Sequence, residues 1–202
     1  MHTIPHPPGF YFFERGWLSS NNFLLMDDEH TTLIDTGYVT HADQTLALVL
    51  SQLSGRSLSR ILNTHLHSDH CGGNAKLQAA FPDTQIWIPP GHFDAVLHWD
   101  EDLLTYKATG QQCPRFVPHH VLIPGSSVES GSFTWEVHAA PGHDSHSVVL
   151  FEPQQKVLIS ADALWSNGFG VVFPELEGVH AFDDVGATLD LIEALNPLWV
   201  LP

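Results

Sequence analysis

The sequence predicts an α/β fold in which two sheets pack face to face with helices outside. Three observations support this. Short apolar segments end at Gly, Pro or Asn, a segment with helical periodicity follows the first three of them, and strands followed by helices occur in two successive halves. No linker is visible between the halves. We therefore expect a single domain over residues 1–202.

The first half begins as a β-meander and continues as strand, helix, strand. In residues 41–53, Leu46, Val49, Leu50 and Leu53 fall at i, i+3, i+4 and i+7, which is typical of an amphipathic helix. The strands of this half are predicted at residues 10–13, 23–26, 31–34, 60–64 and 85–88, and its second helix at residues 74–80.

The second half follows a segment without clear periodicity, residues 91–125, which we expect to be a partly helical excursion and a candidate lid. Val185, Leu189 and Ile192 share one face of a last helix, over residues 184–195. The strands of this half are predicted at residues 132–138, 147–151, 156–160 and 198–201.

The composition excludes several partners. Seven Lys and Arg against 23 Asp and Glu give a net charge of −16, which disfavours nucleic acid and anionic membranes. No apolar run reaches the roughly 18 residues of a membrane helix, and two cysteines are too few for a disulfide framework, so we expect a cytoplasmic protein. The 15 histidines outnumber Lys and Arg twofold and point to metal chemistry.

The strongest motif is His-Leu-His-Ser-Asp-His at residues 65–70, directly after a predicted strand. In extended backbone, residues two apart point the same way, so His65 and His67 can present two imidazoles to one ion. Asp69 and His70 lie where the chain turns toward a helix and can bind a second ion. A polar loop is the alternative, but a chance match has odds of roughly half a per cent.

Two further candidates, His143 and Asp162, follow later predicted strands. Layered folds place their sites at the carboxyl ends of strands, so this shared position favours a site over a loop histidine and a turn cap. A dinuclear centre would then be nearly complete. Its ligands would be His65, His67 and His143 for one ion, Asp69 and His70 for the other, and Asp162 between them.

These segments resemble the metallo-β-lactamase superfamily of metal-dependent hydrolases, in its glyoxalase II and lactonase-like branch. The resemblance spans roughly residues 23–202 and rests on Asp-Thr-Gly at 35–37, the run 65–70, His143 within Pro-Gly-His-Asp-Ser at 141–145, and Asp162. It implies a four-layer αββα sandwich with two metal ions, usually zinc, with iron or manganese as alternatives. It also implies the ligand set given above.

Two further residues are expected around the metals. It implies that Asp35 braces the metal loop without coordinating. His146, three residues after His143, is a candidate to line the pocket.

The sequence departs from the family pattern at its C-terminal end. The family closes its second metal site with a His in a Gly-His pair after the last strand, and the sequence given stops at Pro202. We expect the native chain to continue and to supply that His. A chain that ended at Pro202 would favour a mononuclear or inactive protein.

We predict hydrolysis of a small ester, lactone, thioester or amide by a metal-bound hydroxide. Asp69 would orient the hydroxide and pass its proton to the leaving group. Two alternatives stay open, a mononuclear iron oxidoreductase of the same superfamily and a non-catalytic metal-binding protein. The partner would be a small molecule, and the oligomeric state is not predicted. Candidate pocket walls are Trp99, Tyr106, Phe116 and Trp165.

Overall fold

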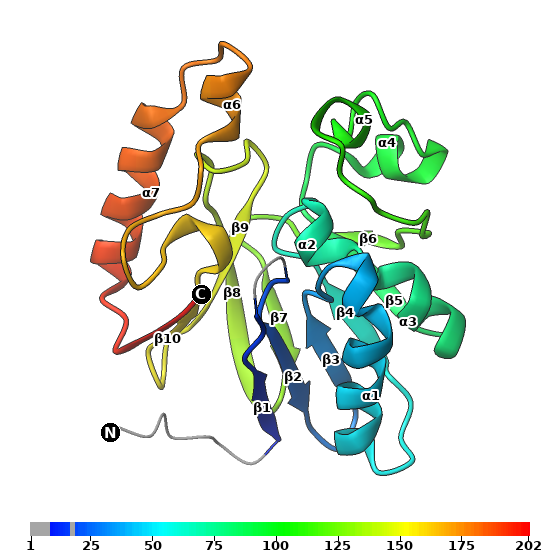
Figure 1. Cartoon of the computed structure of the whole chain (residues 1–202). Helices are drawn as coiled ribbons and strands as arrows, with labels where there is room; N and C mark the ends of the chain where they lie inside the picture. Colours follow the sequence, from blue (N-terminus) through cyan, green and yellow to red (C-terminus); the bar gives the residue numbers. More distant parts are fainter. Residues whose placement is uncertain (1–8, 17–18) are drawn as a thin grey trace. The chain divides into compact units, whose positions relative to one another are not determined.

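The computed structural model describes residues 9–16 and 19–202 and divides them into two compact units. The N-terminal unit comprises the described residues up to 121 together with 130–132, and the C-terminal unit comprises 122–129 and 133–202. In Figure 1 the chain is coloured from blue at its first residues to red at its last. Two mixed sheets with helices are present, so the predicted α/β class is confirmed.

The N-terminal sheet begins as the predicted antiparallel meander and continues with parallel strands. Leu33 pairs with Ile61, and Ile61 with Ile86, in the three central strands. Because β3 and β4 are parallel, the residues that follow them leave the sheet at the same edge. In spatial order the strands are β1 (Phe10–Phe13), β2 (Asn22–Met26), β3 (Thr31–Ile34), β4 (Arg60–Leu62), β5 (Gln85–Ile88) and β6 (His120–Val121).

Two helices, α1 (Ala42–Leu53) and α3 (Asn74–Ala80), pack on this sheet (Figure 1). Val49 and Leu53 of α1 are buried in the same core cluster as Leu33 and Ile61. Leu50, predicted on the buried face, is 52% exposed, and Thr45 is buried instead. The apolar part of the buried face of α1 is therefore narrower than the periodicity predicted. The polar Thr45 takes one of its positions, where its hydroxyl is held by hydrogen bonds.

Residues 91–125 contain two short helices, α4 (Phe93–His98) and α5 (Tyr106–Thr109), and the short strand β6. Tyr106 and Phe116, predicted as pocket walls, are buried in the N-terminal core, where the Trp99 ring contacts both. This prediction was wrong because large aromatic side chains fill cores as readily as they line pockets. The role of this segment as a lid, and the single domain over 1–202, stay predictions.

The C-terminal sheet is antiparallel except for its last pair, β10 and β11. Helix α7 (Phe182–Leu195) packs on it through Ile192, which shares a core cluster with Val149 and Leu158 (Figure 1). In spatial order its strands are β11 (Trp199–Leu201), β10 (Val157–Ile159), β9 (Val148–Glu152), β8 (Phe133–Ala139) and β7 (Ser127–Ser130).

Strands β8 and β10 both run antiparallel to β9, so their carboxyl ends lie at the same edge of the sheet. His143 follows β8 and Asp162 follows β10. A short helix, α6 (Phe173–Leu176), precedes α7 in the chain. Among the described residues, no helix combines the length and the apolar character needed to cross a membrane.

Candidate metal centre

The N-terminal unit brings three imidazoles together just after β4. The ring centroids of His65 and His67 lie 4.7 Å apart, and those of His65 and His70 lie 4.0 Å apart. The side chains of His65 and His70 are buried, and His67 is 9% exposed. Imidazole is a good ligand for zinc and iron, so the chemistry of this group fits a transition metal.

Asp69 and His70 lie in a short helix, α2 (Ser68–Cys71), that periodicity did not predict. A four-residue helix contains no repeat of apolar positions, so the sequence carries no such signal. The Asp69 carboxylate is 38% exposed, and its Oδ2 lies 3.8 Å from His70 Nε2. Both side chains are therefore close enough to bind one ion.

Two glycines, Gly72 and Gly73, follow α2 because the chain is crowded there. A Cβ on Gly73 would lie 2.5 Å from the Thr36 carbonyl oxygen, and one on Gly72 would contact the Ser68 carbonyl and lie 2.6 Å from the Val39 nitrogen. Gly72 has an ordinary helical φ of −62°. Close approach of backbone segments, and not turn geometry, thus requires glycine.

Asp35 holds His70 from the side. Its Oδ2 lies 2.7 Å from His70 Nδ1, and Thr64 donates to it twice, from its backbone N–H at 2.9 Å and from its hydroxyl at 2.7 Å. Because a carboxylate can only accept, His70 donates from Nδ1, and the lone pair stays on Nε2. Asp35 is buried and adopts a left-handed φ of 53°. The structure thus sets the His70 tautomer that metal binding needs.

A second set of contacts holds the backbone of His70. Its carbonyl oxygen accepts from the Thr36 backbone N–H at 2.7 Å, the Thr36 hydroxyl at 3.1 Å and the Asn63 side-chain amide at 3.3 Å. Asn74 donates to Asn63 at 2.7 Å and accepts from the Thr36 hydroxyl at 2.9 Å. All three side chains are fully buried. Sequence reasoning missed this network, although Asn63 and Asn74 flank the histidine motif.

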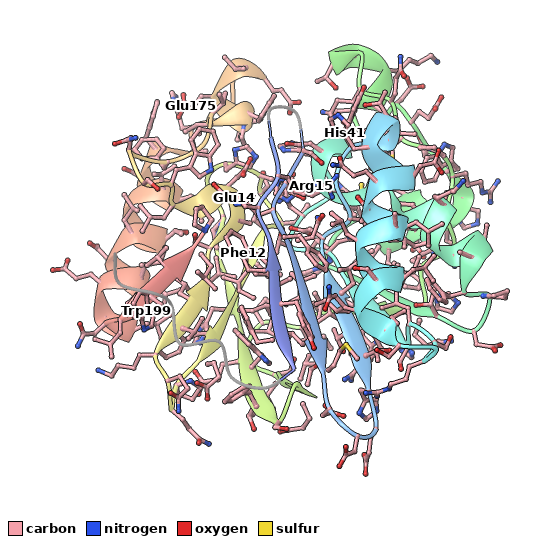
Figure 2. All side chains as sticks on the ribbon, turned by 60° about the horizontal axis from the view of Figure 1, so that its bottom comes forward. Phe12, Glu14, Arg15, His41, Glu175 and Trp199 are labelled. Atoms are coloured by element: carbon pink, nitrogen blue, oxygen red, sulfur yellow. The ribbon has the colours of Figure 1, made fainter. Side chains whose placement is uncertain are left out.

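The network extends to α1 through Thr45 and Arg15. Thr45 Oγ1 donates to the Thr36 carbonyl at 3.0 Å and accepts from Arg15 at 2.7 Å. Figure 2 shows Arg15 beside α1, where it also donates to Asn22 at 2.6 Å. Burial lowers the pKa of the Arg15 guanidinium from its usual value. A chain of hydrogen bonds therefore links β2, α1 and the histidine loop.

The C-terminal unit brings His143 and Asp162 together. His143 Nε2 lies 3.2 Å from Asp162 Oδ2, and the indole N–H of Trp165 donates to Asp162 Oδ1 at 3.2 Å. Phe173 contacts the His143 ring edge to face at 5.4 Å. Of the predicted pocket walls, Trp165 is the one beside a candidate ligand, and it is 45% exposed.

Gly170 leaves space beside the two candidate ligands, His143 and Asp162. A Cβ there would lie 2.5 Å from His143 Nδ1 and 2.8 Å from the Asp162 carbonyl oxygen, which accepts from the Gly170 N–H at 3.0 Å. A small pocket lies at this point, with His143, Asp162, Phe169 and Gly170 in its lining. His146 is half-buried in the same loop, where its backbone N–H donates to Asp144 at 2.8 Å. Its role in the pocket stays a prediction.

Cys71, next to His70, is a buried thiol that donates to the carbonyls of Leu66 and His67, both at 3.3 Å. Burial raises the pKa of Cys71 well above its usual value, and it does the same for the Tyr106 phenol. Both groups therefore stay protonated near neutral pH. A protonated thiol is a poor metal ligand, so Cys71 is a buried structural group of the histidine loop.

With this fold and these residues, the chain belongs to the metallo-β-lactamase superfamily, whose family model matches residues 15–202. The predicted family is thus confirmed. One curated relative, a hydroxyacylglutathione hydrolase of Nostoc sp., is 30% identical over 190 residues, which cover 92% of this chain and 62% of the relative. A hydroxyacylglutathione hydrolase of Francisella philomiragia is 27% identical, with 93% and 62% covered. The chain spans about six tenths of the length of these relatives.

Solved structures confirm the predicted fold class. The B3 metallo-β-lactamase BLEG-1 matches with a TM-score of 0.69 and 23% identity, covering 90% of this chain and 83% of that one. The metallo-β-lactamase family protein TTHA1429 from Thermus thermophilus matches with a TM-score of 0.72 and 22% identity, covering 94% and 71%. TTHA1623 in a di-iron-bound form matches with a TM-score of 0.70 and 27% identity, covering 92% and 86%.

Proposed function

We propose that the chain is a metal-dependent hydrolase whose two ligand sets form one dinuclear centre. The observation that carries the proposal is the buried Asp35 contact with His70 Nδ1, which directs Nε2 toward a metal. Superfamily membership and the pairing of His143 with Asp162 support it. The proposed ligands are His65, His67 and His143 for one ion, Asp69 and His70 for the other, and Asp162 as the bridge.

Zinc, iron or manganese ions in such a centre lower the pKa of water and polarise a substrate carbonyl. The residues of the chain would do the rest. Asp69, partly exposed and close to His70, would accept the proton of the attacking water at Oδ2 and deliver it to the leaving group. Asp35 would accept from His70 Nδ1 and hold the His70 proton there.

The proposed substrates share a carbonyl that bears a leaving group, in an ester, lactone, thioester or amide. The curated relatives are named as hydrolases of a glutathione thioester, so a thioester is the first substrate to test. The di-iron-bound form of TTHA1623 makes iron a metal to test beside zinc. A cytoplasmic location and a His beyond Pro202 stay predictions.

The test is to purify the protein without chelator, determine its metals by elemental analysis and assay one substrate of each bond class. We expect at least one metal per chain and turnover of at least one class. Metal-free protein with unchanged unfolding behaviour would contradict the proposal.

The Asp162→Asn variant sharpens this test, because a bridging carboxylate can span two cations where a neutral amide cannot. We expect it to lose the second metal first and to lower turnover by several orders of magnitude. Asp190→Asn, on the exposed face of α7, is the matched control. Equal turnover in the two variants would refute the assignment of Asp162.

A further inference from the structure

Cys71 and Cys113 are the two cysteines of the chain, and they lie in contact. Their Sγ atoms are 3.7 Å apart, although 42 positions separate them in sequence. Cys71 ends α2, and Cys113 lies in the segment after α5. Neither cysteine is among the proposed metal ligands, so the metal centre does not explain their contact.

The two thiols differ in access. Cys71 is fully buried, whereas Cys113 is half-buried between the exposed residues Gln112 and Pro114. A small solute therefore reaches Cys113 before Cys71. An accessible thiol beside a second thiol is the arrangement of a reacting and a resolving cysteine.

We propose that Cys71 and Cys113 form a modification site at which a hydroperoxide produces an intramolecular disulfide. The Cys113 sulfur would attack the peroxide, break its O–O bond and become a sulfenic acid, while the other oxygen leaves as water or an alcohol. The Cys71 sulfur would then attack the sulfenic sulfur, lose its proton and release water. Two thiols are oxidised by two electrons, and one peroxide is reduced.

The geometry suits this reaction. A disulfide bond is about 2.05 Å long, so the sulfur atoms must approach by about 1.6 Å from the 3.7 Å observed. Cys113 can supply most of this movement, since its other sulfur contacts, to the carbonyls of Cys71 and Pro114, are long at 3.8 Å.

The bond would tie the segment after α5 to the helix that carries Asp69 and His70. One contact already joins them, from the Ser68 N–H to the Gln111 side chain at 2.7 Å. Nearby, the Tyr106 hydroxyl of α5 donates to the carbonyl of Leu66, two residues before α2, also at 2.7 Å. In a reducing compartment the disulfide would be transient. This proposal is independent of the proposed hydrolase activity.

The test treats the purified full chain with hydrogen peroxide and then counts thiols after denaturation. We expect the two titratable thiols to fall to none and to return after reduction with a dithiol. Peroxide also oxidises the two methionines, so the deciding readout is a linked peptide and not intact mass. Trypsin cleaves after Arg60, Lys76, Lys107 and Arg115 and should release residues 61–76 joined to 108–115.

Two variants complete the test. In Cys113→Ser, Cys71 should stay a thiol because it is buried. In Cys71→Ser, Cys113 should add oxygen atoms and gain no partner. Wild-type protein that keeps both thiols, adds oxygen at Cys113 without the linked peptide, or forms only links between chains would overturn the proposal.

Discussion

His70 and His143, one candidate ligand from each unit, are held in different ways. Asp35 fixes the His70 ring, and three donors hold its carbonyl oxygen, all from buried side chains or buried backbone. Around His143 the tight contacts come from glycine. Gly170 approaches its ring, and Asp162, its neighbour, accepts from the partly exposed Trp165.

The difference teaches that the candidate ligand His70 depends on specific polar side chains, whereas His143, paired with Asp162, also depends on the absence of a side chain at position 170. Substitutions that remove hydrogen-bonding groups should therefore damage the N-terminal set, and substitutions that add atoms should damage the C-terminal set. Paired variants can test each half of this comparison.

Asp35→Ala should have the largest effect among the residues that position ligands. The His70 ring loses its acceptor and its fixed tautomer, so we expect metal affinity to fall about 10–100-fold. Competition with a chromophoric chelator measures this. Asp28→Ala, at an exposed position seven residues away, is the control. Equal metal affinity in both variants would show that the contact with His70 is dispensable.

Gly170→Ala should be next. Its methyl group cannot fit 2.5 Å from His143 Nδ1, so the ligand pair must shift, and we expect a cost of about 1–3 kcal/mol. Gly186→Ala is the control, because that exposed position in α7 has open space and alanine should stabilise the helix by about 0.5–1 kcal/mol. Denaturant unfolding and metal content measure both. A stable Gly170→Ala protein with full metal content would break the comparison.

Asn63→Ala should lower the free energy of unfolding by about 1–2 kcal/mol, because the amide of buried Asn74 loses the acceptor Oδ1 that Asn63 provides. Chemical denaturation measures the change, with the exposed Gln112→Ala as the reference. If Asn63→Ala were as stable as the reference, the buried network would contribute nothing to the free energy of unfolding.

Trp165→Phe should have the smallest effect. It keeps an aromatic ring but removes the indole N–H that donates to Asp162, so we expect metal affinity to change only a few fold. Trp165 fluorescence, taken as the difference between wild type and variant, should also respond to added zinc. A difference spectrum that zinc leaves unchanged would place Trp165 outside the influence of the metal.

Most of the strands and the longer helices could be predicted because apolar periodicity records which face each segment buries. The short strands β6 and β7 were not predicted. The histidine motif could be found because its ligands are close in sequence. The network of Thr36, Asn63 and Asn74 could not be predicted, since single polar residues just after a strand or at the start of a helix have no spacing that distinguishes them from loop residues. Tyr106 and Phe116 were misassigned because composition does not say which side of an aromatic ring meets solvent.

The three hydrogen bonds to the His70 carbonyl have a consequence for metal exchange. These hydrogen bonds fix the conformation of the candidate ligand His70 in the folded chain. The conformational entropy of this residue is therefore lost when the chain folds, and binding of an ion would cause no further loss. An ion can then enter or leave without a folding step. Which metal the proposed centre takes would then depend on supply and relative affinity in its surroundings, and not on the order of events during biosynthesis.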